Sequence, residues 1–525
     1  MMVKHQEHLF DEKGLSHWLG GKSLEYFCMF YLAEIYTGDN KAELAAIHYT
    51  IWQELEDMIL NVTHGNQNYI MPRGIGKSTF ISLPLSIWCA VYKYKKYIVI
   101  CSSISDTAES FILNIKIALN GNERITASFG PIYDSKKYIN NSEKIELGNQ
   151  TMIQSISASS TLRGKTYGNT RIELALLDDY QKDDQIISHD QREKKWKRFN
   201  DDITYAMQKG NATIIAVGTL QCKEDFYDRL RKSPVWKTRQ EKGVLVDDVD
   251  ELFNNGLWLE FKRILLDIKN EFRLDDATEF YLQNKEAMQY PLLWQEYWDC
   301  CDYALSYFAS SSSFKQEVQG DIDNVGEKKF TTILTESADE IESHTFNKTL
   351  LAVDPAGTRN KGGKKDFYAY EVCSAANNGI KYARKSLVYQ HEYENYLAEV
   401  LRLLKAYTDI TTVVIEKNTY MGADVIKLQE LISVDSELKG RNLTWVNFHQ
   451  NANKDDKINT IIGMVNLGQV VFNEDDTEAI QQLKDFAGVK FSLHDDFPDV
   501  LAEALNRVDN IESVGKIKIT ENWFR

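Results

Sequence analysis

The sequence predicts an α/β protein made of two α/β domains in tandem. Between residues 67 and 219, short β-rich runs alternate with longer helical or polar segments, which is typical of a parallel sheet with helices on both faces. A second set of strand-like runs begins at residue 349, after a polar stretch. At 525 residues the chain also exceeds the size of a single ordinary core.

The first domain is expected to span residues 1–325. Its α/β core covers about residues 45–222, and the predicted strands are NYIM (68–71), YIVICSSI (97–104), TMIQSISA (151–158), IELALLDD (172–179) and ATIIAVGT (212–219). From about residue 223 to 325 the alternation is lost and the chain becomes helical and aromatic, as in LWLEFKRILLDI. We therefore expect a helical lid subdomain there.

The second domain is expected to span residues 347–525. The stretch from 320 to 347 is rich in charge and poor in apolar periodicity, so we place a linker at residues 326–346. After it come the predicted strands TLLAVD (349–354), DFYAYEVC (366–373), KSLVYQ (385–390) and TTVVIEKN (411–418), which later alternate with helices.

Composition indicates the broad class of protein. A hydrophobic fraction of 43% with 26% charged residues is that of a globular chain with buried cores. No apolar run reaches about 18 residues and the N-terminus lacks an apolar signal region, so we expect a soluble, intracellular protein. The seven cysteines show no C-x-x-C spacing, which predicts neither a disulfide framework nor a zinc site.

The net charge of −16 argues against a protein that coats nucleic acid, because phosphate neutralisation needs a basic face. A local basic groove remains compatible with it. The clusters KYKKY (93–97) and REKKWKR (192–198) are candidates for a few phosphate contacts. The alternative is that both clusters are solvated helix faces.

Residues 71–79, MPRGIGKST, form a candidate phosphate-binding loop. A strand precedes it and an apolar helix follows it, so backbone N–H groups at the helix start point at an anion. Lys77 is expected to reach the β and γ phosphates, and the Ser78 hydroxyl to bind Mg²⁺. The pattern is G-x-x-x-x-G-K-[ST], with Met71 in place of its first glycine.

A buried strand, Leu174 to Leu177, ends in two acids. In an open α/β sheet such a strand end meets the ligand crevice. Asp178 is therefore expected to hold the Mg²⁺ shell, and Asp179 to orient or deprotonate the attacking water. A strand with a merely solvated acidic end is the alternative, which the upstream loop disfavours.

Three strings, PRGIGKST, LRGKTYGNTRIELALLDDY and AVGTLQCKEDFYDRL, resemble the ATPase domain of the large terminase subunit of tailed bacteriophages. The resemblance implies a P-loop ASCE-type ATPase with Walker A and Walker B elements, in which Arg73 is the loop arginine. The carboxylate after the acidic strand is usually Glu in that family, whereas Asp179 stands here. Gly218 and Thr219 match the motif that couples hydrolysis to movement.

The same resemblance implies the residues that contact nucleotide. Arg163 or Arg171 is expected near a neighbouring subunit's nucleotide, and His48 near the adenine, with packing as the alternative for a lone helix histidine. The implied nucleotide-binding set is Arg73, Gly74, Gly76, Lys77, Ser78, Thr79, Asp178, Thr219, His48 and Arg163.

The C-terminal third resembles the RNase H-like nuclease domain that completes large terminases. One strand ends in Asp354, another ends in Glu416, and a late helix opens with HDDFPDVLAEAL, which contains Asp499. Two Mg²⁺ ions roughly 4 Å apart need several carboxylates that converge from different elements. We expect Asp354, Glu416 and Asp499 to hold them.

Other acids and two lysines compete for places near this site. Asp495 and Asp496 are alternatives to the third ligand, and Asp496 is also expected as an additional one. Asp366 is expected to begin the next strand, with a place near the metals as the alternative. Lys454 and Lys457, in a segment that also resembles the family, are expected to contact phosphate.

The resemblance, which covers about residues 45–510, implies ATP and Mg²⁺ as cofactors, with Mn²⁺ possible at the nuclease site. It implies as partners double-stranded DNA, the portal protein of the procapsid, the small terminase subunit and further copies in a pentameric ring, with no membrane. The implied location is the host cytoplasm and, transiently, the portal vertex, with absence from the mature virion.

Two other classes of function stay open. A helicase-like DNA-dependent ATPase would share the loop and the acidic strand, but it would need a second motor domain, and none is visible after residue 345. A non-catalytic adaptor at the portal vertex is the other, because Met71 and Asp179 depart from common patterns.

Overall fold

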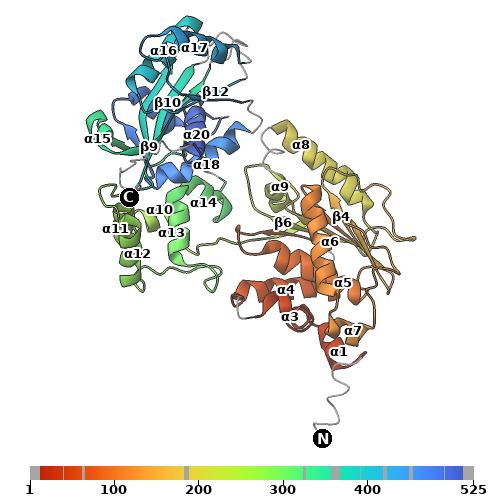
Figure 1. The fold of residues 1–525 in the computed structure, drawn as a ribbon. Helices are drawn as coiled ribbons and strands as arrows, with labels where there is room; N and C mark the ends of the chain where they lie inside the picture. Colours follow the sequence, from red (N-terminus) through yellow and green to blue (C-terminus); the bar gives the residue numbers. More distant parts are fainter. Residues whose placement is uncertain are drawn as a thin grey trace, which may run out of the picture. The chain divides into compact units, whose positions relative to one another are not determined.

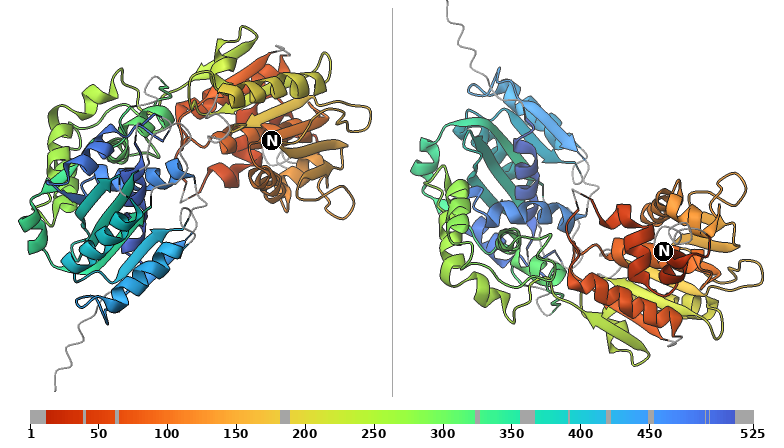
Figure 2. Two further views of the ribbon diagram at one scale, coloured as in Figure 1. Left: turned by 90° about the horizontal axis from the view of Figure 1, so that it is seen from above. Right: turned by 90° about the horizontal axis from the view of Figure 1, so that it is seen from below.

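The chain folds into two compact units in a computed structural model. The structure describes residues 12–38, 41–61, 65–181, 189–322, 327–355, 367–390, 392–417, 422–448, 453–489, 491–492 and 494–511, so Asp366 lies outside it. Unit 1 comprises residues 1–249, 289–303 and 313–325, and unit 2 comprises residues 250–288, 304–312 and 326–525. Figure 1 and Figure 2 show one sheet with flanking helices in each.

The sheet of unit 1 has the order β3-β4-β2-β5-β6-β1-β7. Its strands are β1 (Asn66–Ile70), β2 (Tyr97–Ser102), β3 (Lys144–Leu147), β4 (Thr151–Ser157), β5 (Leu174–Asp178), β6 (Thr213–Gly218) and β7 (Trp236–Gln240). All neighbours pair in parallel except β3 and β4. The predicted parallel sheet is confirmed, and β6 lies between β1, which precedes the candidate loop, and β5, which ends in Asp178.

Helices cover both faces of this sheet. Strands such as β2, β5 and β6 are therefore buried along their whole length. One face packs on α4 (Ala46–Leu60), α5 (Leu83–Val91) and α6 (Ser105–Leu119). The other packs on η5 (Phe199–Thr204) and α9 (Phe226–Lys232). The remaining elements are α1 (Leu15–Gly20), α2 (Leu24–Tyr26), η2 (Phe27–Tyr31), α3 (Ala33–Tyr36), η3 (Ser78–Ser82), α7 (Glu123–Phe129) and α8 (His189–Arg198).

The sheet of unit 2 has the order β13-β12-β9-β10-β11-β14-β8. Its strands are β8 (Leu334–Glu336), β9 (Phe346–Asp354), β10 (Tyr368–Ala376), β11 (Lys381–Tyr389), β12 (Thr412–Glu416), β13 (Thr444–Phe448) and β14 (Val470–Asn473). Strands β9, β10 and β11 form an antiparallel meander, and β12 and β13 extend it in parallel on the far side of β9. This five-strand arrangement confirms the RNase H-like, mixed α/β fold.

Helices again cover both faces. The helices α16 (Tyr393–Ala406) and α17 (Ala423–Val434) pack on one face. The other face packs on α18 (Lys454–Asn466), α19 (Thr477–Asp485) and α20 (Asp496–Val508). Because side chains alternate along a strand, Leu350 and Ala352 of β9 face α20, whereas Leu351 and Val353 face α16 and α17.

The helical subdomain expected at residues 223–325 does not form one body. Its elements α10 (Val249–Phe253), α11 (Gly256–Leu265) and α12 (Arg273–Gln283) group with unit 2, whereas α13 (Cys300–Ala309) and α14 (Ser311–Glu317) divide between the units. A contact with the unit 2 core explains the grouping, since Arg273 donates to the carbonyl of Gly468 at 2.8 Å. The periodicity of a sequence indicates that such helices form, but it does not indicate with which unit they pack.

The described part of the expected linker, residues 327–346, is folded onto unit 2. Strand β8 pairs with β14 in parallel, and Phe330 is buried in the core. Helix α15 (Ala338–Ser343) follows, with a capping box in which Ser337 and Glu340 bond each other's backbone N–H groups. The high charge of this stretch led to the prediction of a linker, whereas it contains a three-residue strand and a short, well-capped helix.

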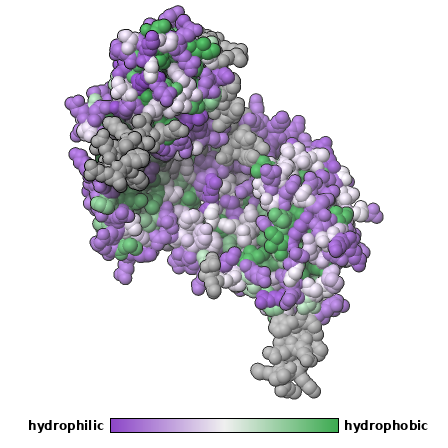
Figure 3. Space-filling model, in the orientation of Figure 1, coloured by the Kyte–Doolittle hydropathy of each residue, from purple (hydrophilic) through white to green (hydrophobic). Residues whose placement is uncertain are grey.

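Surface composition agrees with a folded globular chain. Figure 3 shows a largely hydrophilic face with an apolar area over α6, to which Leu113 and Ile117 contribute with exposures of 57% and 65%. In the part of the chain that the structure describes, no helix has the length and apolar character needed to cross a membrane.

Candidate functional site

The candidate phosphate loop lies between β1 and η3, at the carboxyl edge of the sheet. Gly74 and Gly76 have φ of +81° and +74°, a conformation that glycine adopts without strain. The N–H of Met71 donates to the carbonyl of Gly218 at 3.0 Å, which ties the loop entrance to the end of β6. Met71 is buried, so the side chain that replaces the first glycine of the pattern points into the core.

The structure brings together the loop and the acidic strand. Ser78 Oγ donates to Asp178 Oδ1 at 2.7 Å, so the two predicted Mg²⁺ ligands are neighbours. Lys77 Nζ lies 3.3 Å from the carbonyl oxygen of Pro72, folded over the loop. Burial raises the pKa of Asp178 to about 6, with a further contribution from Asp179, against the effect of its serine partners.

Sequence reasoning missed Ser82, whose hydroxyl donates to the other oxygen of Asp178. Because Ser78 and Ser82 are four residues apart, they project from the same side of a helical turn. That spacing is a signal that the sequence contains. The two hydroxyls hold the carboxylate of Asp178 at the loop.

Asp179 follows the strand in a left-handed conformation, with φ of +41°, and is exposed. Its N–H donates to the carbonyl of Val217 at 2.9 Å, and its own carbonyl accepts from the N–H of Ser103 at 3.1 Å. A non-glycine residue held at positive φ is strained, and such strain is concentrated at functional sites. The turn thereby separates the buried Asp178 from the solvent-facing Asp179.

The other residues of the predicted set lie in different surroundings. Thr79 is exposed, and Thr219 is buried just beyond the end of β6. Arg73 has an exposed side chain whose Nη1 lies 3.9 Å from Glu317 Oε2. Arg163 forms an ion pair with Asp202 at 2.7 Å, and Arg171 Nη1 donates to the carbonyl of Tyr205 at 2.9 Å.

The adenine contact expected for His48 is not supported, because this side chain is a packing residue beneath the loop. It is 1% exposed and stacks on Phe80, with ring centroids 3.9 Å apart. Nδ1 accepts from the N–H of Ala45 at 3.0 Å, and Nε2 lies 3.4 Å from the carbonyl oxygen of Ile75. Both ring nitrogens therefore serve the fold.

His48 should make unit 1 sensitive to acid. Burial lowers its pKa from 6.5 to about 4, so between these values the unfolded chain binds a proton that the folded chain does not. The free energy of unfolding that neutral His48 contributes is fully present above pH 6.5 and is lost as the pH drops towards 4. At 1.36 kcal/mol per pKa unit, the loss is about 3 kcal/mol. Urea unfolding at pH 7 and pH 5 should show that the free energy of unfolding falls less between these two pH values in His48→Phe than in the wild type. An identical loss in both proteins would contradict this assignment.

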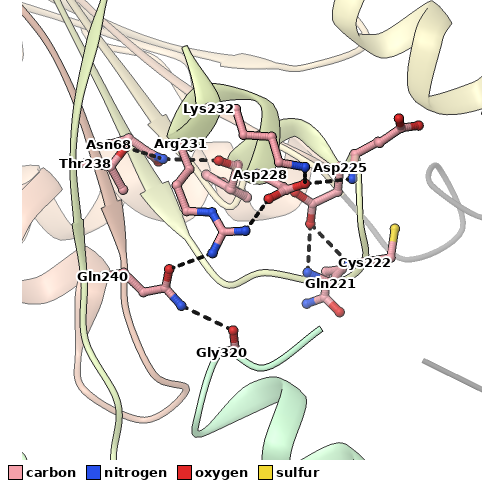
Figure 4. Close-up of polar contacts among 12 residues, drawn as sticks. Asn68, Gln221, Cys222, Asp225, Asp228, Arg231, Lys232, Thr238, Gln240 and Gly320 are labelled. Atoms are coloured by element: carbon pink, nitrogen blue, oxygen red, sulfur yellow. Dashed lines mark hydrogen bonds and ion pairs between the residues drawn. The ribbon is translucent and has the colours of Figure 1, made fainter. Parts of the chain in front are cut away.

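The turn after β6 is held by buried carboxylates (Figure 4). Asp225, which is 0% exposed, caps α9 by accepting from the N–H of Asp228 at 2.8 Å, and it also accepts from the N–H of Gln221 at 2.7 Å. Asp228 accepts from Arg231 at 2.5 Å and from Lys232 at 2.6 Å. The turn is therefore a rigid extension of the strand that carries the predicted coupling residues.

The end of α14 contacts both this turn and the loop, a link that sequence reasoning missed. The N–H of Arg73 donates to the carbonyl of Glu317 at 2.8 Å. Gln316 Nε2 donates to the carbonyl of Gln221 at 3.0 Å, and Gln221 Nε2 donates to Glu317 Oε1 at 3.3 Å. Nothing in the local pattern near residue 317 indicates these contacts, which join segments about 240 and 95 residues apart.

A second site lies at the carboxyl ends of β9 and β12 in unit 2. Each of Asp354, Glu416 and Asp499 offers a carboxylate oxygen, and the three oxygens lie within 4.8 Å of one another. Asp354 ends β9, Glu416 ends the adjacent parallel strand β12, and Asp499 lies in the first turns of α20. The structure thus brings together the three acids on which the sequence prediction relied.

The electrostatics of this cluster favour a cation. Burial raises the pKa of Asp354 well above its usual range, and Glu416 and Asp499 raise it further. Burial also raises the pKa of Glu416, again with Asp499 as the next cause. Three carboxylates at this separation repel one another, so a divalent ion, which prefers oxygen ligands, fits the donor set.

Asp495 and Asp496 are outside the three-carboxylate cluster. Asp495 precedes α20 without a capping hydrogen bond from its side chain, and it pairs with Lys454 at 3.2 Å. Asp496, the first residue of α20, raises the pKa of Asp354 through its charge. Of the competing acids, Asp499 is the one that joins the strand-end pair, and the cluster gives no support to Asp496 as a ligand.

The two lysines expected to contact phosphate pair with the carboxylates of this site. Lys454 Nζ lies 3.3 Å from Asp499 Oδ2, and Lys457 pairs with Asp499 Oδ1 and, at 3.6 Å, with Glu503. Burial lowers the pKa of Lys454, but Asp499 and Asp495 raise it by more. The ammonium groups partly neutralise the cluster from the α18 side.

No protein-family model and no curated protein matches the sequence. Among solved structures, the chain is similar to the large terminase of a thermophilic bacteriophage, with 8% identity, coverage of 87% of this chain and 98% of that chain, and a TM-score of 0.45. It is similar to the large terminase of bacteriophage HK97, with 14% identity, coverage of 92% and 99%, and a TM-score of 0.34. It is also similar to the human cytomegalovirus terminase nuclease domain, with 15% identity, coverage of 36% and 95%, and a TM-score of 0.27.

Proposed function

We propose that the chain is a large terminase subunit, an ATP-driven motor that moves double-stranded DNA through a portal into a procapsid. In this proposal it is also a metal-dependent endonuclease that cuts concatemeric DNA when packaging starts and ends. The observation that carries the proposal is the presence of two separate sites on successive α/β units. One is the phosphate loop beside Asp178, and the other is the cluster of Asp354, Glu416 and Asp499.

In the motor unit, the loop backbone and Lys77 bind the β and γ phosphates of ATP. Ser78 and Asp178, already 2.7 Å apart, hold the Mg²⁺ that accompanies ATP. Asp179 faces solvent at the same edge, where it orients the attacking water. Mg²⁺ supplies neutralisation of the charge that develops on the phosphates.

Movement follows from the contacts of the loop. The N–H of Met71 bonds to Gly218, and Arg73 bonds to Glu317, which also contacts Gln221. A change at the phosphates therefore shifts the turn after β6 and the end of α14 together. This coupling supports a motor better than a simple phosphatase, which needs no such connection.

In the nuclease unit, Asp354, Glu416 and Asp499 hold the divalent ions. When bound, these ions supply an activated water and stabilise the leaving 3′ oxygen. Lys454 and Lys457 neutralise Asp499 beside the cluster and, as they release it, present positive charge to a DNA phosphate. Mg²⁺ and Mn²⁺ both suit carboxylate oxygens.

The other two functions have less support. A helicase-like ATPase needs a second motor domain, whereas the sheet of unit 2 has a different strand order and carries the acid cluster. An adaptor with decayed sites does not need Ser78, Ser82 and Asp178 to remain in contact. The proposed partners are duplex DNA, a portal protein, a small terminase subunit and further copies in a ring, with host cytoplasm and the portal vertex as the location.

The test is packaging itself. Purified chain, portal-bearing procapsids, duplex DNA and MgATP are mixed, and the DNA that resists added DNase is measured. We expect protection that requires both ATP and procapsids. The same preparation should not separate the strands of a tailed duplex. ATP-dependent strand separation without protection would replace the motor proposal by the helicase-like alternative.

A further inference from the structure

The aromatic segment of unit 1, residues 294–298, packs against the candidate phosphate loop and takes no part in the proposed mechanism. The indole of Trp298 lies against Gly74, so close that a Cβ added at Gly74 would be 2.6 Å from its Cζ2 atom. The indole also stacks on Tyr303, with ring centroids 5.0 Å apart and an interplanar angle of 21°. The side chain of Trp298 therefore packs directly against the loop at Gly74.

The preceding turn is anchored to the core of unit 1. The indole N–H of Trp294 donates to the carbonyl of Glu43 at 2.7 Å. Its ring meets Phe80 and His48 edge-on, at centroid distances of 5.6 Å and 4.7 Å. Trp294 is 7% exposed, so it forms a fixed base.

Tyr297 rests on this base. Its ring stacks on Trp294 at 4.6 Å with an interplanar angle of 22°, and it meets Trp298 edge-on at 5.2 Å. Yet the residue is 56% exposed, in a unit that buries many of its tyrosines. A ring supported on one side and exposed to solvent is suited to stack on a planar ligand.

We propose that Tyr297, supported by Trp294, is the stacking platform for the base of the nucleotide whose phosphates occupy the loop. Trp298 lies between the platform and the phosphate loop, since it contacts both Tyr297 and Gly74. The larger ring system of a purine gives more stacking area than a pyrimidine, so the expected ligand is a purine nucleoside triphosphate.

This inference rests on the proposed ATPase site and replaces His48 as the residue that recognises the base. His48 and Trp294 are in contact, so the proposed platform lies next to the residue that the resemblance assigned to the base. The exposed surface there belongs to Tyr297, about 250 residues further along the chain.

The test compares two ligands that differ by the nucleoside. Binding of MgATP and of magnesium tripolyphosphate to the full chain is measured by titration calorimetry for the wild type and for Tyr297→Ala. We expect Tyr297→Ala to weaken MgATP binding by about tenfold or more and to leave tripolyphosphate binding unchanged. Tyr297→Phe, which keeps the ring, should bind MgATP like the wild type.

Tyr205→Ala is the matched control, because Tyr205 is also an exposed tyrosine of unit 1, at 74% exposure, and lies outside the aromatic segment. Unchanged MgATP affinity in Tyr297→Ala would overturn the platform, as would equal losses for both ligands. If the wild type bound tripolyphosphate as tightly as MgATP, the platform would be rejected and the phosphate site kept. Failure of the wild type to bind either ligand would reject the proposed ATPase function, and the platform with it.

Discussion

Replacement of Lys77 by alanine is expected to lower ATP turnover by about 10²–10³-fold, the usual effect of removing one donor that stabilises transition-state charge. The Lys77 ammonium lies 3.3 Å from the carbonyl oxygen of Pro72, at the loop and beside the Ser78–Asp178 pair. An alanine keeps the helix start but leaves the β and γ phosphates without this cation. DNA packaging should be lost together with ATP turnover.

Metal-dependent cutting of DNA should persist in Lys77→Ala, because the acid cluster belongs to unit 2. Phosphate release and plasmid cleavage are measured on the same preparation. Lys209→Ala is the control, since Lys209 is an exposed lysine of unit 1 in a turn. Full ATP turnover in Lys77→Ala, or loss of cutting alone, would show that the loop is not the nucleotide site.

Replacement of Asp354 by asparagine is expected to have the reverse effect. Partners in the outer shell of a metal site already contribute about 10–100-fold in affinity or activity, so loss of a direct ligand should lower cutting by at least about 100-fold. ATP turnover should remain. Plasmid cleavage with Mg²⁺ or Mn²⁺ is compared with phosphate release, and Glu437→Gln, at an exposed glutamate of unit 2, is the control.

Asp354→Asn should also make the metal-free protein more stable. Burial and three neighbouring carboxylates raise the pKa of Asp354, which means that its charge destabilises the fold at neutral pH. The neutral amide removes that repulsion at nearly the same volume. With a chelator present, the melting temperature should rise relative to the wild type. The increase that Mn²⁺ causes in the wild type should shrink. A lower melting temperature with an unchanged response to Mn²⁺ would mean that the cluster does not bind metal.

Local patterns in the sequence indicated most strands and both sites. The runs at 97–104, 151–158 and 172–179 each contain consecutive apolar residues, so their strands β2, β4 and β5 were predictable. Strand β3 has only four residues and β8 only three, which is too short for periodicity to reveal. The same limit hid the folded part of residues 327–346.

The choice among Asp495, Asp496 and Asp499 could not come from the sequence. All three lie within five residues, and a helix turns by about 100° per residue, so the selected side chain depends on how α20 packs. The packing of α20 against β9 and β10 directs Asp499 towards Asp354 and Glu416. Asp495, just before the helix, pairs with Lys454 instead.

By itself the sequence determined that the chain has two α/β sheets, a candidate phosphate loop at residues 71–79 and strands that end in Asp178, Asp354 and Glu416. These features depend on residues that are neighbours along the chain, so local composition and spacing reveal them. Only the tertiary structure decided that Ser82 shares Asp178, that His48 is buried and that Tyr297 is exposed beside the loop. Those contacts join segments that are distant in sequence or depend on which side of a helix is buried, and the packing of the whole unit sets them.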